Sequence, residues 1–118
     1  MSISSLKKEI KTYAFDIDGV ICKTVNGNYH QAIPNEKAIK KINEIYLNGN
    51  EVIIFTARFM GRTNNDVKKA ENLGYNETLI QLKKWGVKFH KLYMGKPSYD
   101  IFIDDKAYNY NDDWIKKI

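Results

Sequence analysis

The chain has 118 residues, 43% of them hydrophobic and 28% charged, which predicts one globular domain over residues 1–118. No apolar run approaches the ~18 residues of a membrane helix, no signal-peptide pattern opens the chain, and a single cysteine excludes an internal disulfide, so we expect a cytoplasmic protein without a membrane partner. The net charge of +5 comes from dispersed lysines, which favours solvated helix faces over nucleic-acid binding and also suits a small anionic substrate.

The chain begins with a strand and a flap. Residues 1–10 predict either a short helix or a loose tail, and the apolar run after them predicts a buried strand over 11–17 that ends at an acidic pair. Residues 21–33 predict a hairpin-like flap, because Asn26 and Gly27 both accept the positive φ of a two-residue turn.

The middle of the chain predicts a helix and a second strand. Apolar residues recur at helical spacing over 35–47, and Asn48-Gly49-Asn50 ends this helix because these residues tolerate a left-handed backbone. The apolar run that follows predicts a strand over 51–56 that is covered on both faces.

The second half of the chain predicts further helices and strands. We expect two short helices on either side of Gly74, the first capped by Thr63 or Asn64 and the second by Asn76. The remaining elements are a third strand, a fourth strand and a closing helix, over 89–94, 100–103 and 112–118. Strands that alternate with helices predict a parallel α/β sheet.

Polar side chains follow three of the predicted strands. Asp16 and Asp18 follow the first strand, Thr56 ends the second, and the pair Asp104-Asp105 follows the fourth. Because ligands of parallel sheets bind at the carboxyl ends of the strands, we expect these residues to lie close together.

These residue types fit the transfer of a phosphoryl group. The Asp16 carboxylate can attack phosphorus and form an aspartyl-phosphate, and Asp18 can protonate the leaving oxygen once the chain turns at Gly19. Thr56 can donate to a phosphate oxygen through its hydroxyl and its backbone N–H, and Lys96 supplies a positive charge. Taken singly, each of these residues also fits a surface turn, a strand end or an exposed lysine.

The acidic residues also predict a magnesium ion. Two adjacent carboxylates repel each other unless a cation lies nearby, which applies to Asp104 and Asp105. We expect Asp105 to bind Mg²⁺ together with Asp16 and Asp18, and Asp104 to pair with Lys96, although the roles of Asp104 and Asp105 can be exchanged.

The ordered set Asp16-Ile17-Asp18-Gly19, Thr56, Lys96 and Asp104-Asp105 resembles the four motifs of the haloacid dehalogenase (HAD) superfamily. The resemblance implies a Rossmann-like three-layer sandwich with a mostly parallel central sheet, Mg²⁺, Asp16 as nucleophile and Asp18 as general acid/base. It also implies a hydrolase that acts on phosphate monoesters. The stretches between the motifs leave no room for a cap domain, so we expect a capless, open site.

A closer resemblance rests on the segments 16–22, 55–60, 78–87, 95–97 and 104–107, which are similar to small capless HAD proteins of capsular polysaccharide biosynthesis. It implies a phosphatase for a sugar phosphate in surface-polysaccharide synthesis. An open site also suits a macromolecular substrate such as a phosphoprotein or a nucleic-acid end, or closure by a partner subunit or a second copy of the chain. A non-catalytic phosphate-binding module is a further alternative, although it gives no reason to keep both Asp16 and Asp18.

Substrate-binding candidates lie on the flap and after the second strand. They are Lys23, Tyr29, His30, Ala57, Arg58, Phe59 and Arg62, besides Thr56 and Lys96. Arg58 either binds a second anionic group of the substrate or forms a salt bridge to a helix. Tyr29 and Phe59 either support a sugar ring or pack in the core. Cys22 fits a buried apolar residue better than a nucleophile.

Overall fold

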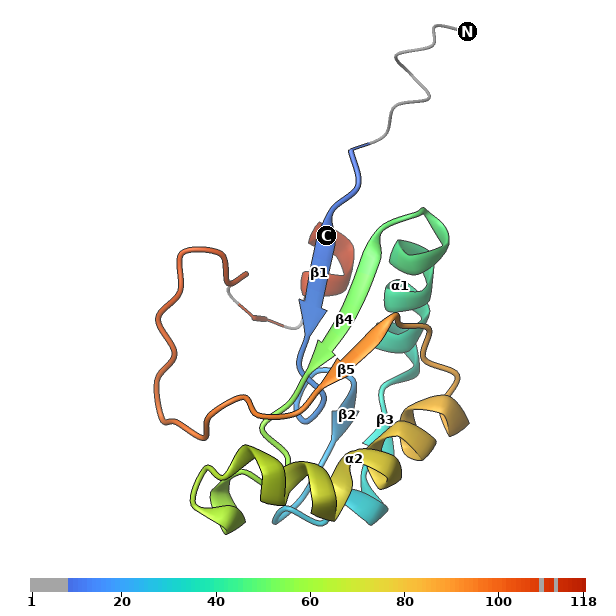
Figure 1. Ribbon diagram of the computed structural model, residues 1–118. Helices are drawn as coiled ribbons and strands as arrows, with labels where there is room; N and C mark the ends of the chain where they lie inside the picture. The colour runs from blue at the N-terminus through green and yellow to red at the C-terminus, as the bar shows by residue number, and fades with distance from the viewer. Residues whose placement is uncertain (1–8, 109, 112) are drawn as a thin grey trace, which may run out of the picture.

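The computed structural model describes residues 9–108, 110–111 and 113–118 (Figure 1). Its centre is a parallel sheet of β1 (Thr12–Phe15), β4 (Glu51–Phe55) and β5 (Lys91–Tyr93), in the order β1-β4-β5. The predicted α/β class and the first three predicted strands are confirmed. The helices among the described residues are too short or too polar to cross a bilayer.

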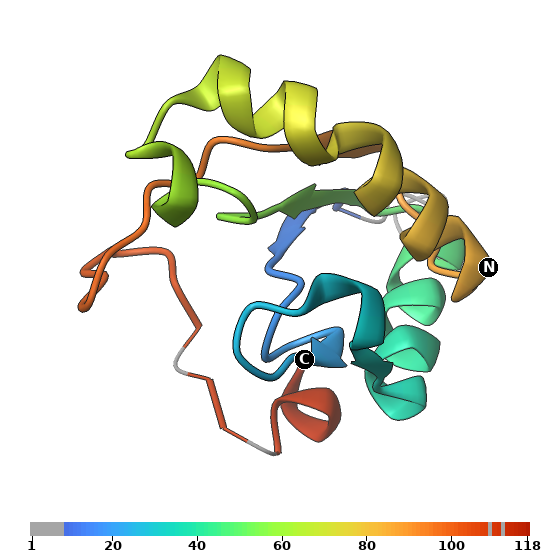
Figure 2. The same cartoon turned by 90° about the horizontal axis from the view of Figure 1, so that it is seen from below.

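Helices lie on both faces of this sheet. Figure 2 shows α2 (Val67–Lys84) on one side, and α1 (Glu36–Leu47) with the short α3 (Trp114–Lys117) on the other. The main core is largely aliphatic, and its fully buried residues include Val52 and Ile54 of β4, Ile42 of α1 and Leu82 of α2. Burial of each such side chain stabilises the fold by roughly 1.5–3 kcal/mol.

The helix predicted over 35–47 is confirmed as α1. The Asn35 side chain accepts a hydrogen bond from the Ala38 N–H at 3.1 Å, which caps the helix N-terminus. Gly49 follows the C-terminus with a φ of 91°, a left-handed conformation that glycine adopts without strain.

The prediction of two short helices around Gly74 is wrong, because α2 runs through this glycine without a break. Asp66 caps the helix by accepting from the Lys69 N–H at 3.1 Å. Gly74 serves packing instead, since a Cβ atom at this position would lie 2.0 Å from Cε2 of Phe59. The glycine leaves room for the Phe59 ring against the helix.

The flap over 21–33 is present, but its strands are only β2 (Cys22–Lys23) and β3 (Ile33–Pro34), which pair antiparallel. Asn26 and Gly27 have φ values of 54° and 67°, so the predicted turn is confirmed. It does not join the two strands directly. A longer loop with the 3-10 turn η2 (Tyr29–Gln31) lies between them, because the flap packs on other parts of the molecule.

The predicted fourth strand over 100–103 is wrong. These residues form no strand, and the side chains of Ile101 and Ile103 are 80% and 92% exposed. Among the described strands, β1 pairs with β4 alone. The expected closing helix is shortened to α3, whose Trp114 packs 5.7 Å from the Phe15 ring. Residues 1–8, which hold most of the expected N-terminal helix or tail, and Asp112 lie outside the described residues.

Candidate active site

Strand register places three of the expected residues at one edge of the sheet. Phe15 lies opposite Ile54 in the parallel pair β1–β4, so Asp16 and Thr56 leave their strands at the same edge. The Lys96 N–H donates to the Thr56 carbonyl at 3.2 Å, which brings the loop after β5 to the same place. The ends of the three strands therefore meet there (Figure 1).

Asp16 and Lys96 form the central ion pair of this edge. Lys96 Nζ lies 3.5 Å from Asp16 Oδ2, and the lysine side chain is only 15% exposed. Burial raises the pKa of Asp16, and the nearby Lys96 charge only partly opposes this effect. Burial lowers the pKa of Lys96, but its contact with Tyr99 and the charge of Asp16 outweigh burial and hold this pKa above its usual value. Lys96 is therefore a permanent cation beside Asp16.

The loop after β1 turns sharply, as expected. The Ile17 carbonyl accepts hydrogen bonds from the N–H groups of Val20, Ile21 and Cys22 at 3.1, 2.8 and 3.2 Å. Gly19 has a φ of 88°, which favours glycine although there is space for a Cβ atom. This turn takes the Asp18 side chain out of the strand direction and toward the flap.

Asp18 is held by an arginine that is almost completely buried. Arg58 donates from Nε to Asp18 Oδ2 and from Nη2 to Asp18 Oδ1, both at 3.0 Å, and only 2% of the arginine is exposed. Of the two readings of Arg58, the structure supports an ion pair. Its partner is Asp18 rather than a charge on a helix, and no exposed guanidinium remains to bind a second anionic group.

Thr56 was expected to donate to a phosphate oxygen through its hydroxyl and its backbone N–H, and only the hydroxyl is available for this. Its backbone N–H donates to the Tyr93 carbonyl at 3.0 Å and so extends the pairing of β4 with β5, which makes the expected role of this N–H wrong. Its hydroxyl oxygen accepts from the Arg58 N–H at 3.1 Å and keeps its own hydrogen to donate. Ala57 follows half-buried, and its carbonyl accepts from the Met60 N–H at 3.0 Å.

The flap candidates divide into packed and exposed residues. Tyr29 and Phe59 meet edge to face at 4.9 Å, and the Arg62 guanidinium lies 5.0 and 4.8 Å from the two ring centres, so packing is the better reading of both rings. His30 Nε2 lies 2.7 Å from Glu77 Oε1. Lys23 is exposed.

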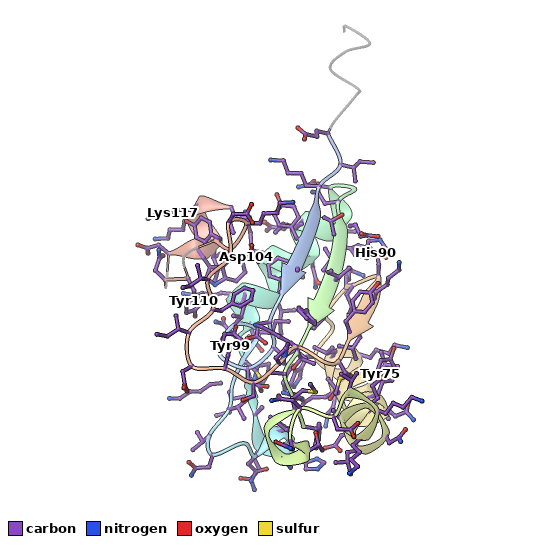
Figure 3. All side chains as sticks on the ribbon, turned by 60° about the vertical axis from the view of Figure 1, so that its left-hand side comes forward. Tyr75, His90, Tyr99, Asp104, Tyr110 and Lys117 are labelled. Carbon is purple, nitrogen blue, oxygen red and sulfur yellow. The ribbon has the colours of Figure 1, made fainter. Side chains whose placement is uncertain are left out.

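The acidic pair Asp104-Asp105 does not lie at this edge in the structure. Both residues are exposed on a segment without regular structure, where Asp104 Oδ1 accepts from the Lys106 N–H at 3.0 Å. Figure 3 labels Asp104 on this segment, on the β1 side of the sheet. The expected pairing of Lys96 with Asp104 is wrong, since Lys96 pairs with Asp16.

The expected magnesium ligands are therefore not assembled. Among the described residues, no three His, Cys, Asp or Glu side chains gather closely enough to hold a metal ion. Asp18 uses both carboxylate oxygens on Arg58, and Asp16 pairs with Lys96. The arrangement as it stands does not fit Mg²⁺.

Cys22 is buried, and this burial raises the pKa of its thiol. A thiol with a raised pKa is a poor nucleophile. The expectation that Cys22 is a small buried residue is confirmed.

Sequence reasoning missed two residues that touch this site. Thr24 Oγ1 donates to Asp18 Oδ1 at 2.5 Å, and Gln81 of α2 accepts from Arg58 Nη1 at 2.7 Å. Thr24 lies outside the segments that carry the resemblance, and Gln81 lies inside the segment 78–87, for which the sequence suggested no site role. Gln81 stands on a helix far from the acidic pairs in sequence, so only the fold shows its role.

No protein-family model matches this sequence, and no curated protein matches it. Among solved structures, a crystal structure of an MCSG target from Vibrio cholerae is similar, with a TM-score of 0.74 and 25% sequence identity. The match covers 92% of this chain and 95% of that chain. The two proteins therefore share their α/β fold over nearly their whole lengths.

Proposed function

We propose that this protein is a HAD-type phosphatase that hydrolyses phosphate monoesters through an aspartyl-phosphate. The observation that carries the proposal is the Asp16–Lys96 pair, at 3.5 Å, beside Thr56 at the carboxyl edge of the parallel sheet. This is the edge at which α/β proteins bind their ligands. A carboxylate, an ammonium and a hydroxyl are the groups that attack, neutralise and orient a phosphoryl group.

The proposed reaction has two steps. A carboxylate oxygen of Asp16 bonds to phosphorus while the bond from phosphorus to the ester oxygen breaks, and Asp18 gives this oxygen a proton. Water then attacks the phosphorus of the aspartyl-phosphate while the bond from phosphorus to the Asp16 oxygen breaks, Asp18 takes a proton of the water, and inorganic phosphate leaves. Lys96 offsets the negative charge that the two oxyanions bring together, and the Thr56 hydroxyl donates to a phosphoryl oxygen.

We propose Mg²⁺ as the cofactor only together with a rearrangement of the segment after Lys96. Asp16 would supply a carboxylate oxygen and Asp18 its backbone carbonyl, since the Asp18 carboxylate is held by Arg58, and Asp104 or Asp105 would have to approach them. Among the described strands, β1 pairs only with β4, so its other edge is available to the segment that carries Asp104 and Asp105. The charge of a magnesium ion would neutralise the phosphoryl oxygens.

The proposed substrate is a sugar phosphate of surface-polysaccharide synthesis in the cytoplasm. This choice rests on the resemblance of the segments around Asp16, Thr56 and Lys96 to capless enzymes of that class. The alternative is a phosphoprotein or a nucleic-acid end, and a non-catalytic phosphate-binding module is a third candidate. A partner subunit or a second copy of the chain would close the open site.

The test is phosphate release from a panel of sugar phosphates, nucleotides and an aryl phosphate, with and without Mg²⁺. We expect turnover by the wild type and a loss of at least about 10³-fold in Asp16→Asn. Turnover that survives Asp16→Asn would show that Asp16 is not the nucleophile. Folded protein that binds phosphate but hydrolyses nothing in the panel would favour the binding module.

A further inference from the structure

We infer that the flap over 21–33 stays closed during turnover, and that Gln81 is a positioning residue that holds Asp18 to this flap through Arg58. The flap is therefore a rigid side of the site and not a moving lid. The contacts between the flap and Asp18 do not depend on the proposed function, whereas their effect on turnover rests on the proposed phosphatase activity. Three groups of contacts carry the inference.

The first group surrounds the Asp18 carboxylate. Arg58 donates to both of its oxygens at 3.0 Å, and Thr24, inside the flap, donates to Oδ1. A bidentate arginine leaves a carboxylate little freedom to rotate. The orientation of Asp18 is therefore set by one residue of the β4 loop and one residue of the flap.

The second group joins Arg58 back to the flap. Gln81 accepts from Arg58 Nη1 through Oε1 and donates through Nε2 to the Tyr29 carbonyl, both at 2.7 Å. The Tyr29 ring also lies 4.6 Å from the Arg58 guanidinium carbon. These hydrogen bonds, together with the flap backbone between Thr24 and Tyr29, join Asp18, Arg58, Gln81, Tyr29 and Thr24 in a closed ring, which we call the positioning network.

The third group attaches the tip of the flap. Arg62 Nη2 donates to the Gly27 carbonyl at 3.2 Å, and the Phe59 N–H donates to the Tyr29 hydroxyl at 3.4 Å. The His30–Glu77 pair is exposed, with 76% and 36% of the two side chains in solvent. Solvent screening makes that pair weak, so it serves as an internal control.

Opening of the flap would separate these contacts together. Arg58 would keep its hydrogen bonds to Asp18 and Gln81, but its buried guanidinium would lose the two flap groups that cover it, the Tyr29 ring at 4.6 Å and Cys22 Sγ at 3.7 Å. The hydrogen bonds of Thr24 to Asp18 and of Gln81 to the Tyr29 carbonyl would break at the same time. We therefore expect the substrate to reach Asp16 from the other side, past Lys96. On that side, Lys96 Nζ lies 5.4 Å from the Tyr99 ring centre and 5.8 Å from the Phe102 ring centre.

The test is hydrogen exchange of the flap peptides in wild type, Gln81→Leu and the control Glu77→Gln. We expect the flap amides of Gln81→Leu to exchange at least about tenfold faster, because the hydrogen bond that anchors the Tyr29 carbonyl and the one to the buried Arg58 are both lost. Glu77→Gln breaks only the exposed pair and should stay within about twofold of wild type. Thermal unfolding of each variant confirms that the global fold is retained.

A second variant separates the two halves of the network. Gln81→Glu keeps an acceptor for Arg58 and removes the donor to the Tyr29 carbonyl, so it should free the flap while Asp18 stays paired. With an aryl phosphate we expect kcat of Gln81→Leu to fall at least about tenfold with KM within about threefold, and kcat of Gln81→Glu to fall less.

Wild-type exchange rates in the flap of Gln81→Leu would overturn the inference. So would a change in KM alone, because a positioning residue acts on the reacting group and not on substrate affinity. If the wild type hydrolyses no phosphate ester, the proposed function fails, but the exchange experiment still decides whether Gln81 holds the flap.

Discussion

The two acidic pairs of this protein lie in opposite surroundings. Asp16 and Asp18 follow a strand that is paired with β4, and residues from the loops after β4 and β5 contact their carboxylates. Asp104 and Asp105 follow a segment that forms no strand, and the pKa of Asp104 is lowered mainly by the N–H of nearby Lys106. The comparison shows that strand pairing, and not the Asp-rich motif, orients a carboxylate.

The largest expected effect on stability comes from breaking the Asp18–Arg58 pair. Arg58→Met leaves Asp18 without its bidentate partner and Gln81 without its donor, and we expect a loss of about 3 kcal/mol in the free energy of unfolding. Urea denaturation measures it. Arg58→Lys is the matched control, because it keeps the charge and loses the planar fork. If Arg58→Met lowered the free energy of unfolding by less than the loss of an exposed ion pair does, Asp18 would be held no more firmly than the exposed Asp104, and the comparison would fail.

The next effect comes from Gly74. Gly74→Ala places a methyl group 2.0 Å from the Phe59 ring, so the ring must move, and we expect a destabilisation of about 1–3 kcal/mol. Glu71→Ala, at an exposed position of the same helix, is the control and should be nearly neutral. Because Phe59 packs on Tyr29, Gly74→Ala should also loosen the flap in hydrogen exchange. A stabilising effect, as helix propensity alone predicts, would contradict the packing.

A smaller effect tests whether the second acidic pair can join the first. If Asp104 or Asp105 binds Mg²⁺ beside Asp16, then millimolar Mg²⁺ should raise the unfolding temperature of the wild type by binding linkage. Asp104→Asn and Asp105→Asn should reduce this shift unequally and so identify the ligand. Asp100→Asn, on the same segment, is the control. If Mg²⁺ changed the unfolding temperature of all four proteins equally, neither Asp104 nor Asp105 would bind the ion.

The smallest effect concerns the pH dependence of Asp16. Burial raises the pKa of Asp16 above its ordinary value of 3.8, so the stability that it contributes is present below that value and is lost as pH rises through the folded pKa. Asp16→Asn stays neutral, so it should unfold at a higher temperature than the wild type at about pH 7 and not at about pH 3. The carboxylate is 35% exposed, so solvent screening keeps the difference small. Equal differences at both pH values would contradict the raised pKa.

Elements with local signals could be predicted from the amino-acid sequence alone. The apolar spacing over 35–47 with Asn48-Gly49-Asn50 after it predicted α1, and the tolerance of Asn26 and Gly27 for positive φ predicted the flap turn. The apolar runs before Asp16 and Thr56 predicted two parallel strands, and parallel pairing then placed both residues at one edge. These signals hold because capping, turn formation and strand burial depend on residues close together in the chain.

The remaining features depend on contacts between residues that are distant in sequence. Gly74 reads as a helix end but lies inside α2, because the Phe59 ring needs the space of the missing side chain. Arg58 reads equally as a substrate contact, yet it is buried against Asp18, Gln81 and Tyr29. The run before Asp104 has the composition of a strand but no partner among the described strands. The positions of the Phe59 ring and the Arg58 guanidinium are set by contacts with residues distant in sequence, and a strand before Asp104 would need a distant partner as well. A local sequence pattern does not encode such contacts.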